Sequence, residues 1–413
     1  PEGGALLPRL RQAVRRTDRG VCCGIDVGGT DIKAAVSRDG RLLCVKEYDW
    51  DPASSPTAEG ILAPMELLVR LMACCAAGPI TPQLRRALRR DATDREMAQA
   101  VAAHPAAKPD VLGVSFPDIV IRDKVAGGET PKMKGMRDNP ALNYEAAFGE
   151  IRELRQRLLP LCAPGAAVHL ANDGHIAAFT AAAELAFSGD VPDLSGGVIA
   201  HSLGTDFGFG CLLPDGSIPQ TPMELYDFLL DLGSLHRAGL PPEDLRSTRN
   251  ENSGLAGARR YLGQAAAFRL AAERQPRLLT GFARREEGLL TIPSDLRKPC
   301  LEHLMDRAQA GDPDARWVFR QVGVHLGQIS RELDWVMAPE TQVRYLFGRF
   351  VKSPVCFRLM AEGCRSVLPR LRLEAADEDL ACTPLMRDLA GQDVTVAQFG
   401  QAVGAMYFAA MEP

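Results

Sequence analysis

Short apolar runs that end in glycine turns predict buried strands near the start of the chain. Residues 21–29 form such a run, which ends in an aspartate, a valine and a glycine pair. A second strand is predicted over 32–36, and the dipeptide Asp39-Gly40 predicts a hairpin before a third strand over 41–46. Because a strand rather than a helix follows the glycines, the turn is neither a P-loop nor a dinucleotide-binding turn.

Helical periodicity and further short strands alternate along the rest of the chain. The predicted helices cover 60–77, 83–104, 144–159, 176–187 and 397–411, and 226–340 is predicted to be mainly helical. The predicted strands cover 111–116, 167–170, 197–201, 209–213 and 343–347. Residues 117–142 are predicted to form a long loop or a short hairpin. The leucines at 6, 7 and 10, with Val14, predict a short amphipathic helix at the N-terminus. The pattern of 21–46 recurs weakly around 197–220, which predicts two lobes of similar topology.

Size and composition fit a two-domain globular protein. The chain has 413 residues, of which 46% are hydrophobic and 24% charged, and its formal net charge is -4. A chain of this length exceeds one hydrophobic core, and this charge gives no argument for nucleic acid or an anionic membrane surface as a partner. The eleven cysteines include the adjacent pairs Cys22-Cys23 and Cys74-Cys75, and the others are widely scattered without a CxxC pattern, which predicts reduced thiols in the cytoplasm. No signal peptide or membrane span is expected.

The first glycine turn carries residues that suit phosphate binding. Gly28 and Gly29 have no side chains, so backbone N–H groups can approach phosphate oxygens. Asp26, at the end of the strand, can hold a hydrated Mg²⁺ ion that bridges those oxygens. Thr30 supplies a hydroxyl group, and Lys33 adds positive charge nearby. The alternative is a plain hairpin turn.

A second turn of the same kind lies in the second predicted lobe. It contains Gly204, Thr205 and Gly208. Glycine turns are common, so this one has weight only together with the first: one turn in each lobe could clamp a single triphosphate.

The dipeptide Asn172-Asp173 stands where a predicted strand ends. A carboxylate at this position suits a general base that takes a proton from a substrate hydroxyl, and Asn172 could orient the same substrate through its donor and acceptor groups. Alternatively, Asp173 caps the helix that follows. His175 and Glu224 are weaker candidates for substrate binding, since a capping or surface histidine and a solvated glutamate at a helix start are equally good interpretations.

Together these sequence motifs resemble those of the ROK family of bacterial sugar kinases and sugar-responsive repressors. The resemblance rests on Asp26-Val27-Gly28-Gly29-Thr30, the degraded segment Ser115-Phe116-Pro117-Asp118, the sugar loop Pro131–Met136, the pair Asn172-Asp173, the second turn 203–210, and Gly311-Asp312-Pro313, Leu326-Gly327, Pro339-Glu340 and Phe347-Gly348 near the adenosine segment. It covers most of residues 21–410. The first turn and the Asn-Asp pair are its most specific parts.

The resemblance implies a fold and an activity. The fold would be α/β, the two-lobed actin-like ATPase (ribonuclease H-like) fold with a mixed sheet in each lobe and a cleft between them. Residues 20–185 and 395–413 would form the first lobe and 186–394 the second. Mg-ATP would bind with its adenosine near Gly348, and a sugar would lie over Asn172, Asp173 and Glu224. The protein would be a cytoplasmic, homodimeric ATP-dependent sugar kinase without a nucleic-acid or membrane partner.

Three departures from the family pattern concern the substrate and the metal content. The family's motif Gly-Glu-x-Gly-His corresponds to residues 223–227 of this chain. Glu224 is present at the glutamate position, but the histidine of the motif is absent. No cysteine lies in 228–256, so no structural zinc is expected. Lys132 stands where the family has a sugar-binding asparagine, and it could pair with Asp118 or Asp227, bind an anionic substrate, or point to solvent.

Two rivals to the sugar kinase stay open. One is a non-catalytic sugar or nucleotide sensor on the same fold, against which the retained Asp26 and Asp173 argue. The other is a phosphotransferase for an acidic or amino sugar, or for a non-sugar, which Lys132 favours. The roughly twenty residues ahead of Cys22 are too few for the helix-turn-helix domain of the repressors, so a repressor is not expected.

Overall fold

The computed structural model of the protein describes residues 6–128, 131–204, 207–221, 225, 228–231, 256–286 and 289–411. The chain forms two compact units. The first comprises Pro1–Gly197, Gly210–Pro222 and Glu378–Pro413, and the second comprises Val198–Phe209 and Met223–Asp377.

A five-stranded mixed sheet in the order β3-β2-β1-β4-β7 forms the centre of the first unit. Its strands are β1 (Val21–Val27), β2 (Asp31–Arg38), β3 (Arg41–Asp49), β4 (Val111–Phe116) and β7 (Ala167–Asn172). β1, β2 and β3 form an antiparallel meander, while β4 and β7 run parallel to β1. Parallel strands end at the same edge of a sheet, so the carboxyl ends of β1, β4 and β7 lie together.

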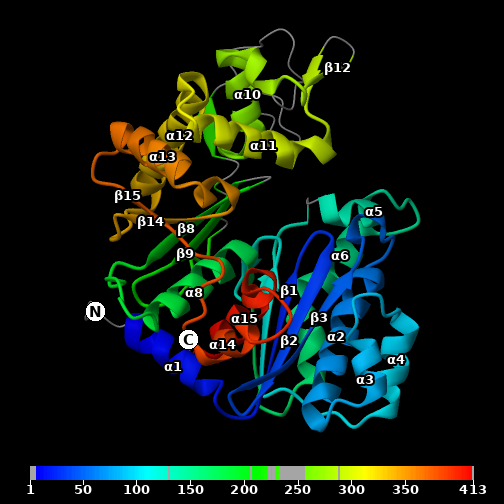
Figure 1. Ribbon diagram of the computed structural model, residues 1–413. Coiled ribbons are helices and arrows are strands. Elements are labelled where there is room, and N and C mark those ends of the chain that lie inside the picture. The colour runs from blue at the N-terminus through cyan, green and yellow to red at the C-terminus, as the bar shows by residue number, and fades with distance from the viewer. Residues whose placement is uncertain are drawn as a thin grey trace. The chain divides into compact units, whose positions relative to one another are not determined.

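Helix α15 (Val396–Ala410) packs against one face of this sheet, next to α8 (Asp173–Ala186) (Figure 1). Gly24 and Gly113 face each other across β1 and β4. A Cβ atom on Gly24 would stand 1.9 Å from the carbonyl oxygen of Ala402, and one on Gly113 would stand 1.8 Å from that of Ala405. Only glycine permits this close approach of helix to sheet, which places the C-terminal helix over the strand ends that carry the candidate site.

Helix α2 (Glu59–Ala77) covers the other face of the sheet. Its buried residues include Ile61, Leu62 and Met65, which belong to the main hydrophobic core of the first unit. α2 is the one described helix long and apolar enough to cross a membrane, with a mean hydropathy of 1.7, and 61% of that stretch is buried inside the protein. The helix predicted over 60–77 is therefore confirmed, and its burial is that of a core helix.

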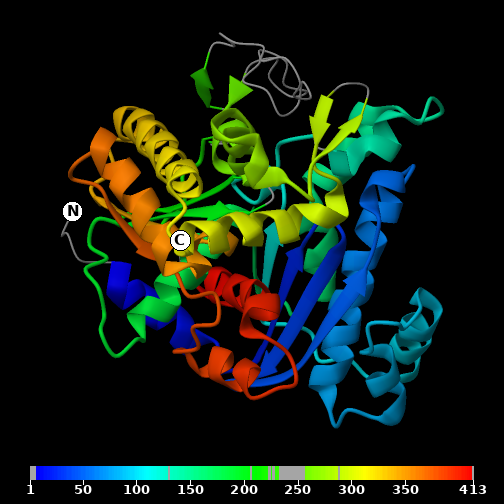
Figure 2. The same ribbon diagram turned by 45° about the horizontal axis from the view of Figure 1, so that its top comes forward.

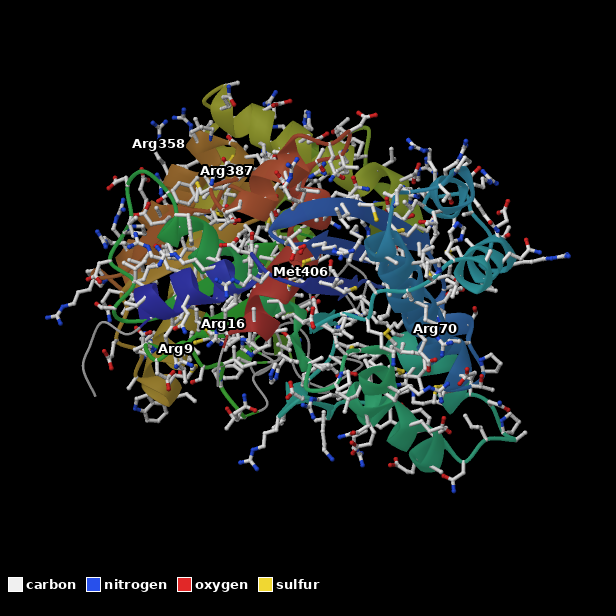
Figure 3. All side chains as sticks on the ribbon, turned by 90° about the horizontal axis from the view of Figure 1, so that it is seen from below. Arg9, Arg16, Arg70, Arg358, Arg387 and Met406 are labelled. Atoms are coloured by element: carbon white, nitrogen blue, oxygen red, sulfur yellow. The ribbon has the colours of Figure 1, made fainter. Side chains whose placement is uncertain are left out.

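Smaller elements complete the first unit. They are η1 (Pro52–Ser54), α3 (Pro82–Ala87), α4 (Asp94–Ala103), the hairpin β5–β6 (Val120–Ile121 and Lys124–Val125), η2 (Pro131–Met133), α5 (Lys134–Arg137), α6 (Tyr144–Arg152), α7 (Leu154–Leu158), η3 (Leu159–Leu161) and α14 (Pro384–Ala390). Helix α1 (Leu6–Arg16) buries Leu6, Leu10 and Val14, and Figure 3 labels Arg9 and Arg16 on this helix. The Arg16 guanidinium donates to the carbonyl oxygen of Ala410, 3.2 Å away.

The second unit combines a four-stranded sheet with a group of helices. The sheet has the order β15-β14-β8-β9, from Arg372–Ala375, Val343–Phe347, Val198–Leu203 and Phe207–Leu212. The last three residues of β9, from Gly210 on, are counted with the first unit. The helices are α9 (Arg259–Leu262), α10 (Gln264–Arg274), α11 (Ser294–Gln309), α12 (Pro313–Met337) and α13 (Pro354–Val367), with η6 (Pro276–Leu279) and η7 (Arg349–Lys352). Two further strand pairs are β10–β11 (Leu229–Asp231 and Ala256–Gly257) and β12–β13 (Arg284–Glu286 and Leu289–Thr291). Figure 2 shows α12 and α13 packed side by side.

Most predicted elements are present, with several shifts. The strand predicted over 343–347 is confirmed with both of its bounds. The predicted hairpin at Asp39-Gly40 joins β2 to β3, and both residues have positive φ. The predicted helix over 83–104 is wrong as one element, because α3 and α4 are separate and Thr93 begins a new helix with a capping box. The predicted repeat is partial: no third meander strand follows β9 among the residues that the structure describes.

Candidate functional site

The first glycine turn connects β1 to β2 at the carboxyl edge of the sheet. The turn is closed by a hydrogen bond from the Gly28 N–H to the Asp31 carbonyl, 2.8 Å long. A Cβ atom on Gly28 would lie only 2.8 Å from that carbonyl oxygen, so the tight turn requires glycine. Gly29 and Thr30 are exposed, which leaves this part of the backbone accessible to a ligand.

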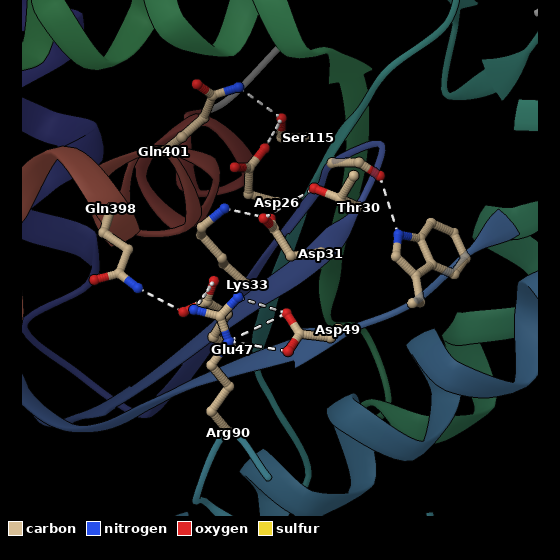
Figure 4. Close-up of polar contacts among 12 residues, drawn as sticks. Asp26, Thr30, Asp31, Lys33, Glu47, Asp49, Arg90, Ser115, Gln398 and Gln401 are labelled. Atoms are coloured by element: carbon tan, nitrogen blue, oxygen red, sulfur yellow. Dashed lines mark hydrogen bonds and ion pairs between the residues drawn. The ribbon is translucent and has the colours of Figure 1, made fainter. Parts of the chain in front are cut away.

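Asp26 is held by a chain of hydrogen bonds that begins on the C-terminal helix (Figure 4). The Ser115 hydroxyl donates to Asp26 Oδ1 at 2.7 Å, and the Gln401 amide nitrogen donates to Ser115 Oγ at 3.0 Å. The same amide nitrogen also donates to the carbonyl oxygen of Asp173 at 3.0 Å. One side chain of α15 therefore connects the candidate metal-binding residue to the backbone of the candidate base.

The enclosure of Asp26 changes its acidity. Burial raises the pKa of Asp26 from 3.8 to about 6, while the Ser115 hydrogen bond opposes this rise and the nearby charge of Asp173 adds to it. Lys33, which lies opposite Asp26 in the β1–β2 pair, lowers the pKa of Asp26. Lys33 also forms an ion pair with Asp31, so its charge is shared between the two carboxylates.

Asn172 and Asp173 lie at the junction of β7 and α8. The prediction that Asp173 caps the helix is corrected here: the cap residue is Asn172, and Asp173 is the first residue of α8. The side-chain oxygens of both accept from the Gly174 N–H, at 2.9 Å from Asn172 and 2.8 Å from Asp173. Burial raises the pKa of Asp173, and the charge of Lys132 is the largest influence that lowers it.

Asp118 is a third carboxylate at this edge, and sequence reasoning gave it only a possible pairing role with Lys132. It is 6% exposed, and its Oδ1 accepts from the Ile119 N–H at 2.7 Å. Its Oδ2 is buried with no hydrogen-bond partner among the described residues. Burial raises the pKa of Asp118 from 3.8 to about 6, and the Asp173 charge adds to the rise. The Asn172 amide nitrogen donates to the Asp118 carbonyl oxygen at 2.9 Å, so the two residues position each other.

Lys132 lies beside the first glycine turn. Its Nζ donates to the carbonyl oxygen of Pro117 at 3.4 Å, and its Cε lies 3.6 Å from the point where a Cβ on Gly29 would stand. Its charge lowers the pKa of both Asp118 and Asp173. Of the expected positions for Lys132, the structure therefore favours one near Asp118; Asp227 lies outside the described residues.

His175 is buried in α8, where its Nδ1 accepts from the Cys211 N–H at 3.0 Å. Burial lowers the pKa of His175 to about 4, so the ring is neutral at physiological pH. A neutral, buried imidazole that bonds the backbone of β9 fits a structural role better than the predicted role in substrate binding.

The second glycine turn is described in part. Gly204 and Gly208 are described, whereas Thr205 and Glu224 lie outside the described residues. A Cβ on Gly208 would stand 2.2 Å from Ser202 Oγ, and Gly204 has open space around its Cα. Gly348, at φ +95°, follows β14, and a Cβ there would stand 2.3 Å from the carbonyl oxygen of Leu203. Gly348 thus lies beside the second turn, within the same unit.

The carboxylates at this edge suit magnesium better than a metal held by protein ligands alone. No group of three or more histidine, cysteine, aspartate or glutamate side chains among the described residues could hold a metal ion. Mg²⁺ is usually held by one or two carboxylates together with waters and substrate phosphates. Asp26 beside an open glycine turn fits that requirement. The expected absence of zinc concerns 228–256, which lies largely outside the described residues and stays a prediction.

Comparison with known proteins shows which solved structures have a similar fold. No model of a protein family matches the sequence, and no curated protein matches it. Solved structures do match. A ROK hexokinase from Thermus thermophilus is 18% identical with a TM-score of 0.52, over 94% of this chain and 97% of that chain. A glucokinase from Balamuthia mandrillaris in complex with glucose is 12% identical with a TM-score of 0.51, over 97% and 98%.

A third solved structure belongs to a different functional class. It is a ROK family transcriptional regulator, a homologue of the E. coli MLC protein, 14% identical with a TM-score of 0.53, over 95% of this chain and 81% of that chain. These likenesses confirm the predicted α/β actin-like ATPase fold of ROK proteins. Because the fold carries both sugar kinases and a regulator, the activity has to be argued from the site.

Sequence reasoning missed the residues that support the site from elsewhere in the chain. Gln401 lies 286 positions from Ser115, and no local motif signals that the two meet. The Trp50 indole donates to the Gly28 carbonyl oxygen from the end of β3. Trp50 stands four residues beyond the strand predicted over 41–46, and no local motif signals its contact with the turn.

Proposed function

We propose that the protein is an ATP-dependent kinase that transfers a phosphoryl group to a hydroxyl of a sugar. One observation carries the proposal: Gln401 bonds both Ser115, which holds Asp26, and the backbone of Asp173, so two carboxylates with different tasks are fixed beside an open glycine turn. The fold shared with a hexokinase and a glucokinase supports it. A regulator needs neither carboxylate for chemistry.

In this proposal the first glycine turn binds the phosphates of ATP. The backbone N–H groups around Gly28 and Gly29 and the Thr30 hydroxyl would donate to phosphate oxygens, and Asp26 would hold Mg²⁺ through bound water. When bound, Mg²⁺ neutralises charge on the phosphates. Ser115 keeps the Asp26 carboxylate oriented toward the end of the strand, and Lys33 balances part of its charge.

Asp173 would act as the general base. The acceptor oxygen forms a bond to the γ-phosphorus, the bond from that phosphorus to the β,γ-bridging oxygen breaks, and ADP leaves with the electron pair. The proton of the acceptor hydroxyl passes to the Asp173 carboxylate. A pKa that burial raises makes this carboxylate a stronger base than an exposed aspartate, and the charge of Lys132 opposes that rise.

The proposal includes further residues of the site. In the second unit, Gly204 and Gly348 would approach the nucleotide, and Thr205, Gly208 and Glu224 keep their predicted roles. Asn172 would position the substrate while its amide bonds the Asp118 backbone. The predicted lobe boundaries, the cytoplasmic location and the homodimer are likewise proposals.

A coupled assay of ADP release over a panel of neutral sugars, amino sugars and sugar acids, with Mg·ATP, tests the proposal. We expect at least one acceptor to raise ADP release well above the rate with water alone. Calorimetric titration of the same panel provides the second measurement. Binding of a sugar or nucleotide without acceptor-dependent ADP release from any compound would favour the non-catalytic sensor and overturn the kinase assignment.

A further inference from the structure

Lys132 is carried by a short segment that is firmly attached to the first unit. Met133 and Met136, which follow the lysine in this segment, are 2% and 0% exposed. A Cβ on Gly135 would stand 2.4 Å from the carbonyl oxygen of Ser55, so α5 lies directly against the backbone that follows η1. This packing fixes the backbone at Lys132 and limits where its side chain can reach.

The side chain of Lys132 extends toward the first glycine turn. Among the described residues, its Cε is the one heavy atom within 4 Å of the position that a Cβ on Gly29 would occupy, outside the residues next to that glycine. The ammonium group has three donors, and the acceptor that it meets among the described residues is the Pro117 carbonyl at the long distance of 3.4 Å. Donor capacity therefore remains beside the exposed backbone of the turn.

Lys132 lies near two parts of the site. Its Cε is 3.6 Å from the position of a Cβ on Gly29, and its charge lowers the pKa of Asp118 and of Asp173. A phosphoryl group moving from a nucleotide on the glycine turn to an acceptor beside Asp173 would pass close to this cation.

We propose that the Lys132 ammonium binds a non-bridging oxygen of the phosphoryl group that is transferred. The inference rests on the proposed kinase function and deepens it, because it assigns to Lys132 a role in nucleotide binding and catalysis instead of contact with the acceptor. A cation at this point stabilises the charge spread over the equatorial oxygens during transfer. It also separates the incoming phosphates electrostatically from Asp118 and Asp173, which would otherwise repel them.

Nucleotide binding tests the contact without reference to activity. We would titrate Mg·ADP and the magnesium complex of a non-hydrolysable ATP analogue into the parent, Lys132→Met and Lys134→Met proteins. Lys134 is exposed and two residues away in the same segment, which makes it a matched control. We expect Lys132→Met to lose about tenfold in affinity for the triphosphate with little change for Mg·ADP, since a hydrogen-bonded ion pair is lost only with the former. The inference would be overturned if the ratio of the affinity for the triphosphate analogue to the affinity for Mg·ADP were the same in the parent and in Lys132→Met.

Turnover distinguishes a phosphate contact from recognition of an anionic acceptor. If Lys132 binds the transferring group, Lys132→Met lowers kcat by about 10²-fold or more for neutral sugars and for sugar acids alike. A loss confined to sugar acids would overturn the inference and leave the kinase assignment intact. A parent that binds the triphosphate but phosphorylates no acceptor would overturn the kinase assignment, while the binding ratios would still decide whether Lys132 meets the terminal phosphate.

Discussion

The Trp50 indole nitrogen donates a hydrogen bond to the carbonyl oxygen of Gly28, 3.1 Å away. The backbone N–H of Trp50 also donates to the Thr30 carbonyl oxygen at 3.1 Å. One residue after β3 therefore holds the first glycine turn on both sides of Gly29. With two carbonyl oxygens bonded by Trp50, the turn is held in one conformation before a nucleotide arrives.

Replacing Trp50 by phenylalanine should weaken nucleotide binding. The change keeps an aromatic ring but removes the donor to Gly28, which leaves the turn held by the backbone bond alone. We expect the KM for Mg·ATP to rise about three- to tenfold and the free energy of unfolding to fall by about 1 kcal/mol. Trp335→Phe is the control, because Trp335 is 86% exposed. An unchanged KM in Trp50→Phe would show that the indole does not support the turn.

Replacing Ser115 by alanine should weaken magnesium binding. The hydroxyl of Ser115 is the donor that orients Asp26 and opposes the rise of its pKa. Without it, a larger fraction of Asp26 is protonated at neutral pH, so we expect the Mg²⁺ concentration for half-maximal activity to rise several-fold, and the increase to shrink at pH 8.5. Ser37→Ala is the control, since Ser37 is equally buried in the same sheet and its hydroxyl contacts the sulfur atoms of Met406 and Cys22 rather than a carboxylate. The same magnesium response in both variants would contradict the role of Ser115.

Local sequence patterns predicted the strands and helices of the first unit well, for physical reasons. A short apolar run bounded by a glycine turn can bury itself in few ways other than as a central strand. The tight turn at Gly28 and the positive φ at Gly40 are both local requirements that glycine meets. The helix break before Thr93 was missed, although Thr93 and Glu96 form a capping box that is visible in the sequence.

The candidate site was predictable only where its residues follow a strand. Asp26 and the Asn172-Asp173 pair stand at strand ends, and parallel pairing through β4 brings those ends together. Gln401 could not be predicted, because its contact depends on how α15 packs against Gly24 and Gly113. His175 shows the converse case: its position two residues after Asp173 suggested the pocket, but the helix turns its ring toward β9.

Replacing Asp173 by asparagine should abolish most phosphoryl transfer. Asparagine keeps the shape and can still accept from the Gly174 N–H, but it cannot take a proton. We expect kcat to fall at least ~10²-fold, with the affinity for Mg·ATP retained. Asp138→Asn, at an exposed position, controls for the change of charge. Turnover close to that of the parent would exclude Asp173 as the base.

Replacing Asp118 by asparagine should stabilise the protein, and more so at high pH. Burial raises the pKa of Asp118 from 3.8 to about 6, so the folded state binds the proton more tightly than the unfolded state. The carboxylate is protonated in both states below about pH 4, and between there and about pH 7 its ionisation increasingly destabilises the fold. The difference in pKa corresponds to about 3 kcal/mol at most, and asparagine keeps the acceptor for the Ile119 N–H. Denaturant unfolding should therefore show a gain of about 2 kcal/mol at pH 8 and little at pH 4, whereas Asp138→Asn should show no such pH dependence. An equal effect of Asp118→Asn at both pH values would mean that the pKa of Asp118 does not change on folding. A loss at pH 8 would mean that the folded protein prefers the ionised carboxylate.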